Sequence, residues 1–322
     1  MTDQMNTHPL YPKRCERTCA DYDKKCPFYE HPSLKAGYEW ADPEDISLEE
    51  LHSRGVWEWN SEKPMLVTLT HAGIKFKDGK PETPIKTGLK GRGMLGKFGP
   101  NHAADPIITC WINNELHFIG VKRNDTDEWA IPGGMVDAGE DGHETLRREF
   151  KEETCNNCED SVLDQIFDKK NSEIIYAGPT YEDPRTTDFA WIETLVVHYH
   201  IDEELANKIT LIPQKSEVKD VKWINCNEKL YGGHKKFIDM VKEKMNYEKL
   251  MDAIPYNQLN EPINMENFNE IGSVFVYMVI VLFSIYYALK LRSEINTEEK
   301  NITMFLCDYN ICHTLLFGNT TS

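Results

Sequence analysis

Seven residues between Gly134 and Glu153 follow a spacing that strongly limits what this part of the chain can form. The pattern is a glycine, five residues, a glutamate, seven residues, and then arginine, glutamate, an apolar residue, any residue and two glutamates. Its positions are filled by Gly134, Glu140, Arg148, Glu149, Phe150, Glu152 and Glu153. This order predicts a glycine loop followed by an acidic helix.

The helix is expected over residues 143–154, where Leu146 and Phe150 mark the face that packs inward. Three carboxylates then crowd one face, because they stand at i, i+3 and i+4: Glu149, Glu152 and Glu153. Carboxylates this close repel one another and destabilise a purely structural helix. A solvated acidic face is the usual explanation of such a run, but the glycine, glutamate and arginine in register with it favour a functional site.

Oxygen ligands gathered in this way suit a hard divalent cation, Mg²⁺ or Mn²⁺. Such an ion keeps several waters and takes phosphate oxygens of a substrate as further ligands. The helix therefore predicts metal-dependent chemistry on a phosphate compound.

The formal net charge of −17 argues against nucleic acid as a partner, because nucleic-acid binders carry a basic face. An anionic substrate would need metal ions or local arginines to reverse this field. The nine cysteines are scattered and odd in number, which is typical of reduced cytosolic thiols. Cys155 and Cys158 form one close pair but lack a second pair at zinc spacing.

Three regions are expected along the chain: an N-terminal domain over 1–104 that contains short strands, a catalytic domain over 105–250, and a tail over 251–322. Strands are predicted at 65–69, 73–76, 107–111, 116–121, 129–131, 191–199 and 218–224. Asp78-Gly79 and Asn113-Asn114 are hairpin turns. Phe237, Met240, Val241 and Met245 are spaced as the buried stripe of a helix. The fold class is α/β, an α/β/α sandwich with a mixed sheet.

Several separate segments now agree with one family in the same order, and the similarity covers about residues 10 to 245. The chain resembles the metazoan, mitochondrial-type ADP-ribose pyrophosphatases of the Nudix 9 type. It is also similar to the ADP-ribose-sensing domain of melastatin-type cation channels. The matching segments are Trp40–Pro43, Gly91–Gly96, Gly99–Pro106, Glu128–Asp137, Glu140–Glu153, Asp183–Asp188 and Val221–Trp223.

The resemblance implies the roles of the helix residues. Glu149 and Glu153 would be metal ligands, Glu152 would hold a second ion, and the carbonyl of Gly133 would complete the shell. Arg148 would hold the glutamates in place. In the vertebrate channel the glutamate that follows this arginine is lost, whereas Arg148 and Glu149 are both present here. The resemblance therefore favours hydrolysis of ADP-ribose to AMP and ribose 5-phosphate.

The family pattern continues with glycine after the last glutamates, whereas Cys155 and Asn156 stand here. This departure concerns the end of the helix, where asparagine tolerates the left-handed conformation that glycine usually supplies.

The substrate end is expected at Asp183, Arg185 and Tyr231, which match residues that contact ADP-ribose in the family. A plain salt bridge in a turn is an equal alternative for Asp183 and Arg185, and a core tyrosine is as good an alternative for Tyr231. Gly233 stands where relatives often carry a polar residue, so that contact is expected to be missing. The catalytic base is expected either on the helix or at Glu217 on a later loop. The alternative explanation of Glu217 is a solvated acid in a loop.

Residues 271–289 carry no charge and at ~1.5 Å per residue would span about 28 Å, close to a bilayer core. They predict a single membrane helix. Lys290 and Arg292 follow it, which would place the C-terminus in the cytoplasm and the catalytic part outside. Asn301 and Asn319, in glycosylation sequons, would suit the opposite orientation. A spurious extension of the chain is the third alternative.

We expect a monomeric catalytic part in the cytoplasm, because the N-terminus has neither a signal peptide nor an arginine-rich amphipathic stripe for mitochondrial import. Two functions of different class are predicted. The first is a Mg²⁺-dependent ADP-ribose diphosphatase, and the second is a module that binds ADP-ribose with little turnover. The sequence leaves open which phosphorus is attacked and how strictly ADP-ribose is preferred.

Overall fold

The computed structural model describes residues 28–31, 34, 40–58 and 65–252. The chain divides into two compact units, residues 1–252 and 253–322, and the second lies wholly outside the described residues. The membrane helix expected at residues 271–289 therefore lies outside them as well. Among the helices that the structure describes, none is both long and apolar enough to cross a membrane.

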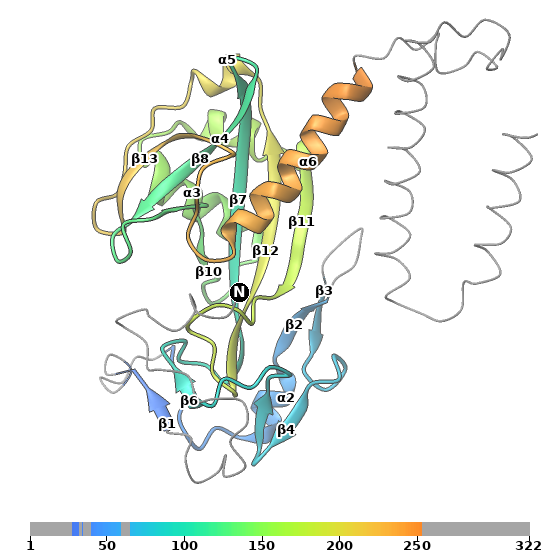
Figure 1. The fold of residues 1–322 in the computed structure, drawn as a ribbon. Coiled ribbons are helices and arrows are strands. Elements are labelled where there is room, and N and C mark those ends of the chain that lie inside the picture. Colours follow the sequence, from blue (N-terminus) through green and yellow to red (C-terminus); the bar gives the residue numbers. More distant parts are fainter. Residues whose placement is uncertain (1–27, 32–33, 35–39, 59–64, 253–322) are drawn as a thin grey trace, which may run out of the picture. The chain divides into compact units, whose positions relative to one another are not determined.

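A seven-stranded mixed sheet forms the centre of the first unit (Figure 1). Its main path follows the order β11-β12-β7-β8-β13, and the two-residue strands β9 and β10 pair with β8 and β7. β12 runs parallel to β7, and the other pairs are antiparallel. The strands are β7 (Gly99–Ile112), β8 (Glu115–Arg123), β9 (Trp129–Ala130), β10 (Gly134–Met135), β11 (Ser172–Pro179), β12 (Ala190–His200) and β13 (Val218–Asn225).

Helices cover both faces of this sheet, as Figure 1 shows. The long ones are α3 (Gly142–Thr154), α4 (Asp160–Ile166) and α6 (His234–Asp252). Leu146 and Phe150 of α3 join the core cluster on one face, together with Ile119 of β8. Val241 of α6 joins the cluster on the other face, together with Phe118. Phe118 and Ile119, successive residues of β8, thus belong to the clusters on opposite faces of the sheet. The expected α/β fold with a mixed sheet is confirmed.

Short elements precede and connect these strands. Three small sheets pair β1 with β6, β2 with β3 and β4 with β5. The bounds are β1 (Phe28–Glu30), α2 (Leu48–Ser53), β2 (Gly55–Glu58), β3 (Met65–Thr68), β4 (Lys75–Lys77), β5 (Lys80–Glu82), β6 (Lys90–Gly93), the 3₁₀ turn η3 (Lys169–Asn171) and α5 (Glu203–Ala206).

The predicted turns form as the sequence indicates. Asn113 and Asn114 have φ of 49° and 68°, and Asp78 and Gly79 have φ of 49° and 76°. Two consecutive positive φ values close a two-residue hairpin whose twist matches that of the strands. The first turn joins β7 to β8 and thereby sets the register on which the site depends.

The buried stripe predicted for α6 is wrong at Met240, which is 38% exposed, and Ile238 is fully buried instead. At about 100° per residue, Phe237, Ile238, Val241 and Met245 fall within one arc of about 100°. Met240 lies about 60° outside that arc. Three of the four predicted residues are buried, Phe237, Val241 and Met245, and the stripe is centred nearer to Ile238 than the spacing predicts.

The expected left-handed end of α3 is also wrong. Cys155 has φ −155° and ψ 57°, and Asn156 is absent from the described non-glycine residues with positive φ. The carbonyl of Thr154 instead accepts a hydrogen bond of 2.8 Å from the N–H of Ile212. A segment distant in sequence thus satisfies the helix end that a left-handed glycine would otherwise satisfy.

Strand β2 is attached to the main sheet through a buried glutamate of β12. Glu193 accepts hydrogen bonds from the main-chain N–H of Trp57 at 2.7 Å and from Nε1 of Trp191 at 2.8 Å. Glu193 is 2% exposed, and burial raises its pKa to about 7. The ring of Trp57 lies over His102 of β7, with 5.4 Å between ring centroids. Strand β7 itself begins at Gly99 and continues through residue 105.

Candidate functional site

Helix α3 begins with a capping box that fixes the position of its first turn. The side chain of Asp141 accepts a hydrogen bond from the N–H of Glu144 at 2.8 Å, and the side chain of Glu144 accepts one from the N–H of Asp141 at 2.9 Å. These bonds satisfy two donors that a helix start otherwise leaves open. The helix therefore starts at Gly142, one residue before the expected start.

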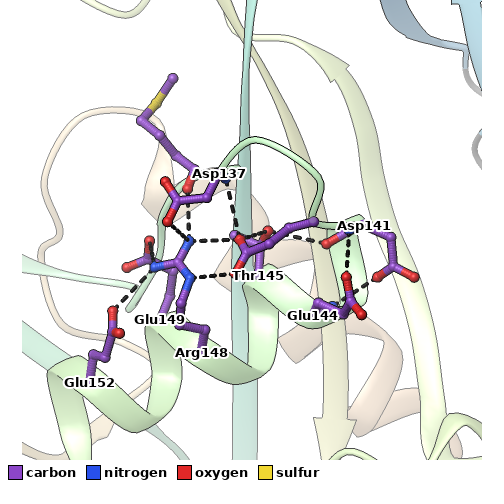
Figure 2. A network of polar contacts seen from close by, with 9 residues as sticks. Asp137, Asp141, Glu144, Thr145, Arg148, Glu149 and Glu152 are labelled. Carbon is purple, nitrogen blue, oxygen red and sulfur yellow. Dashed lines mark hydrogen bonds and ion pairs between the residues drawn. The ribbon is translucent and has the colours of Figure 1, made fainter. Parts of the chain in front are cut away.

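Arg148 is the centre of the polar network on α3 (Figure 2). Its Nε and Nη2 donate to the two carboxylate oxygens of Glu140 at 2.7 and 2.9 Å. Its Nη1 donates to Glu149 at 2.7 Å and to Glu152 at 3.1 Å, and Nη2 also donates to the carbonyl of Met135 at 3.1 Å. One guanidinium thus ties the glycine loop to the acidic face of the helix.

Glu140 fixes the loop in turn. It accepts hydrogen bonds from the hydroxyl of Thr145 at 2.8 Å and from the N–H of Asp137 at 3.3 Å. The hydrogen bonds from Arg148, together with these, lower the pKa of Glu140 to about 2. Glu140 is therefore an ionised structural partner of Arg148, and the pair holds loop and helix together.

Glu149 and Glu153 are the two most buried carboxylates of helix α3. Burial raises the pKa of Glu149 to about 7, although Arg148 opposes the shift. Burial also raises the pKa of Glu153 to about 8, and the negative charges of Glu149 and Glu217 add to the effect. Buried acids with raised pKa values mark a place where a positive charge would be stabilised.

The glycine loop passes directly against these carboxylates. The N–H of Gly133 donates to Glu153 at 3.0 Å. A Cβ atom at Gly134 would overlap the carboxylate of Glu149, and one at Gly133, where φ is 149°, would overlap that of Asp105 on β7. Only glycine lets the main chain come this close, so the two glycines set the spacing between loop, helix and strand.

The donor set fits a hard divalent cation in its chemistry. Glu149, Glu152 and Glu153 supply oxygens only, as Mg²⁺ requires. Within the described part of the chain, no three acidic, histidine or cysteine side chains gather closely enough to enclose an ion as they stand. Nη1 of Arg148 donates to one oxygen of Glu149 and one of Glu152, and each carboxylate has a second oxygen with which to bind an ion.

Asp183 and Arg185 form the turn salt bridge that the sequence left as one alternative. Nε and Nη2 of Arg185 donate to the carboxylate at 2.9 and 2.8 Å, and its main-chain N–H donates at 2.8 Å. Burial raises the pKa of Asp183, but the charge and hydrogen bonds of Arg185 outweigh it, so the pKa lies below its usual range. Both residues also interact electrostatically with Asp105, which places this turn beside the acidic helix.

Tyr231 lies with this pair, at the start of the turn that leads into α6. Burial raises the pKa of its hydroxyl, and the charges of Asp183, Arg123 and Arg185 act on it as well. Its ring is 5.8 Å from that of His234. His234 accepts a hydrogen bond at Nδ1 from the N–H of Ile131 at 3.0 Å, so its proton is on Nε2. Burial lowers the pKa of His234 to about 4, and the imidazole is therefore neutral.

Glu217 stands on the loop that precedes β13. It is exposed, and it accepts a hydrogen bond from Nε2 of Gln214 at 3.0 Å. Its charge acts on both Glu149 and Glu153, so it lies near them. The bond between Ile212 and Thr154 ties the same loop to the end of α3.

Comparison with known proteins now decides the family. A family model described as NUDIX domain matches residues 105–241. The "ADP-ribose pyrophosphatase, mitochondrial" of Rattus norvegicus is 38% identical over 244 residues, which cover 67% of this chain and 67% of that protein. The chain belongs to the Nudix hydrolase family. The helix with its glycine loop is therefore the Nudix box.

Other relatives of this Nudix chain match a smaller part of it. The "Putative nudix hydrolase 6" of Caenorhabditis elegans is 47% identical over 173 residues, 52% of this chain and 65% of that protein. The matched segments thus span about two thirds of the length of these two relatives. A "Transient receptor potential cation channel subfamily M member-like 2" of Nematostella vectensis is 36% identical over 189 residues, 51% of this chain and 12% of the channel.

Among solved structures, the NUDIX domain of Shewanella oneidensis NrtR complexed with ADP ribose is 19% identical. It covers 45% of this chain and 88% of that one, with a TM-score of 0.35. A likeness this weak has no bearing on the family or the site.

Two residues of the site were missed by the sequence reasoning. Asp105 lies between the Nudix box and Asp183, and the hydroxyl of Thr194 on β12 donates to it. His234 reaches the site through the turn before α6. Asp105 could have been found, because a carboxylate directly before the apolar run Pro106 to Ile108 of β7 needs an explanation. His234 gave no such signal, since a single histidine at a helix start is common.

Proposed function

We propose that this Nudix hydrolase cleaves the diphosphate of ADP-ribose, with Mg²⁺, to AMP and ribose 5-phosphate. One observation carries the proposal. Gly133 lies against both Asp105 and Glu153 of the Nudix box, and Asp105 interacts electrostatically with Asp183 and Arg185, which in turn act on Tyr231. A metal-binding face beside a cationic and aromatic cluster suits a diphosphate that carries a sugar.

Each residue of the site has a separate proposed role. Glu149 and Glu153 would hold the metal, with Glu152 on a second ion and the carbonyl of Gly133 as a further ligand. Mg²⁺ bound there would offset charge on the phosphate oxygens and lower the pKa of a water. Arg148 keeps Glu149 on the ligand side of the helix through its bond of 2.7 Å, and Glu140 holds Arg148.

The base that removes a proton from the attacking water is proposed to be Glu217. It is exposed to solvent, close to Glu149 and Glu153, and its loop is tied to the end of α3. Glu152, on the box itself, is the alternative base. Asp183, Arg185 and Tyr231 would hold the ribose 5-phosphate half, where the hydroxyls of the sugar need acceptors and the phosphate needs a cation.

Incubation of the whole chain with ADP-ribose and Mg²⁺ tests the function directly. The proposal expects AMP and ribose 5-phosphate in equal amounts, and no products when EDTA is present. Reaction in ¹⁸O-labelled water then shows which product takes the label, and therefore which phosphorus is attacked. Binding of ADP-ribose without any AMP would contradict hydrolysis and support a sensing module, as the likeness to channel sequences suggests.

Arg185→Ala is expected to weaken ADP-ribose binding by about 1 to 3 kcal/mol, because a charge-assisted phosphate contact is lost. The measurement is the Michaelis constant and, independently, binding without turnover in Ca²⁺. Asp183→Asn with Arg185→Ala serves as control, since the double variant leaves no unpaired carboxylate behind. If Arg185 only closes a turn, stability falls while the Michaelis constant and the rate stay unchanged.

We also propose a membrane attachment, on the strength of the sequence of residues 271–289 alone. Deleting residues 262–322 should leave specific activity unchanged and move the protein from the membrane fraction to the supernatant, because the uncharged stretch is removed. Cell fractionation with an activity assay on both fractions is the measurement. A full-length protein recovered from the supernatant would contradict the attachment. The catalytic part is proposed to be cytoplasmic and monomeric.

A further inference from the structure

Arg123 ends strand β8 at the edge of the proposed substrate site. Its main-chain N–H donates to the carbonyl of Glu128 at 3.0 Å and closes the turn between β8 and β9. It pairs with Val218 of β13, the residue that follows Glu217. The main chain of Arg123 thus lies between the turn that leads to Trp129 and the loop that carries the proposed base. The position of the strand is fixed without any contribution from the side chain.

The side chain of Arg123 is nevertheless held on two sides. Nε and Nη2 donate to the two oxygens of Asp125 at 2.9 and 2.7 Å. The guanidinium carbon lies 4.3 Å from the centroid of the Tyr231 ring. Among the described residues, no hydrogen bond is made by Nη1. The side chain of Arg123 is 30% exposed, so it is partly open to solvent.

A structural role explains this arrangement poorly. A partly exposed arginine–aspartate pair two residues apart contributes little to stability. Holding a long side chain in one geometry costs rotamer entropy. An arginine whose guanidinium is already oriented therefore loses less entropy when it binds an anion. The stacked and paired guanidinium is therefore better explained as a donor prepared for a ligand.

The surroundings indicate the charge of that ligand. Arg123 lies close enough to Arg185 for the two positive charges to repel each other. Both act on the hydroxyl of Tyr231 and on His234. Asp125 and Asp183 each offset one guanidinium. An anion with several oxygens can accept from both arginines, and it would also relieve their repulsion.

We propose that Arg123 is a further substrate-binding residue, which donates from Nη1 to a phosphate oxygen on the ribose 5-phosphate side of the diphosphate. Asp125 and Tyr231 orient it. This inference rests on the proposed function and adds a specificity determinant to it. A sugar phosphate meets two guanidiniums at this end of the site, whereas the AMP half does not contact Arg123.

The test compares product inhibition in four variants. Arg123→Ala should raise the inhibition constant of ribose 5-phosphate about tenfold and leave that of AMP within about twofold. Arg123→Lys should give an intermediate rise of about threefold, because an ammonium binds phosphate as a point charge without the oriented fork. Asp125→Asn should give a smaller rise in the same direction. Lys219→Ala is the matched control, since Lys219 pairs with Asp127 at 3.0 Å in the same region and carries the same charge.

An unchanged inhibition constant for ribose 5-phosphate in Arg123→Ala would overturn the inference. So would an equal change in Lys219→Ala, which would indicate a general effect of charge, or a change confined to AMP. If Arg123→Ala fails to fold, Arg123→Lys decides by the same comparison. A wild-type protein that neither binds nor cleaves ADP-ribose would overturn the proposed function itself, and this inference with it. Normal turnover by wild type with unaltered variants would overturn the inference alone.

Discussion

Glu149→Gln should lower the turnover number for ADP-ribose at least about 10²-fold, because the change removes the charge of a metal ligand and keeps the volume of the side chain. The fold should remain, since Glu149 contacts Arg148 and the glycine loop and supplies no apolar contact to the core. The measurement is kcat at saturating Mg²⁺, together with the melting temperature.

The direction of the stability change in Glu149→Gln also follows from its burial. Burial raises the pKa of Glu149 to about 7 in the absence of metal, above the value of an unfolded chain. The metal-free wild type therefore loses stability as the pH rises from 4.5 to about 7, because the folded state holds this proton more tightly than the unfolded state over that range. The Glu149→Gln variant should lose less stability than the wild type over this pH range. Near-normal turnover that still depends on Mg²⁺ would remove Glu149 from the mechanism, and Glu204→Gln, an exposed glutamate on α5, is the control.

Arg148→Ala is expected to lower kcat about 10- to 100-fold while leaving the Michaelis constant for ADP-ribose within about threefold. Changes to residues that orient metal ligands have effects of this size. Four groups lose a donor at once: Glu140, Glu149, Glu152 and the carbonyl of Met135. The measurement is steady-state kinetics at several Mg²⁺ concentrations.

The adjacent Arg147 provides a matched control for Arg148. It lies on the same helix and donates to Asp164 at 2.6 Å, away from the box carboxylates. Arg147→Ala should therefore leave kcat unchanged. If Arg148→Ala instead raises the Michaelis constant and spares kcat, Arg148 contacts the substrate and does not act through the glutamates.

The acidic helix was predictable because its information is local. The spacing of Leu146 and Phe150 fixes which face is buried, and that in turn fixes where Glu149 and Glu153 point. The role of Arg148, by contrast, is implied by the resemblance to the family and not by the spacing. Met240 shows the limit of such reasoning, because periodicity gives the width of a buried stripe and leaves its centre open by one residue.

The remaining residues of the site depend on contacts between distant segments. Asp105 meets Glu153 because β10 pairs with β7, and it is held by Thr194 because β12 runs parallel to β7. No sequence pattern within β7 predicts its register with β10 or with β12. His234 and Arg123 likewise approach Tyr231 only after the sheet and α6 are assembled. Local patterns therefore predicted the acidic helix of the candidate site more completely than the cluster around Tyr231.

The attachment of β2 to Glu193 has a consequence for anyone who shortens this protein. A fragment that begins at residue 105, where the family model begins, would cut β7 after its first six residues and remove Trp57. Glu193 would then lose one of its two donors, and Ala190 to Leu195 would lose their partners in β7. Thr194, which holds Asp105, lies within that exposed edge. The smallest fragment suitable for kinetics therefore has to include β2, although no residue of β2 belongs to the Nudix box.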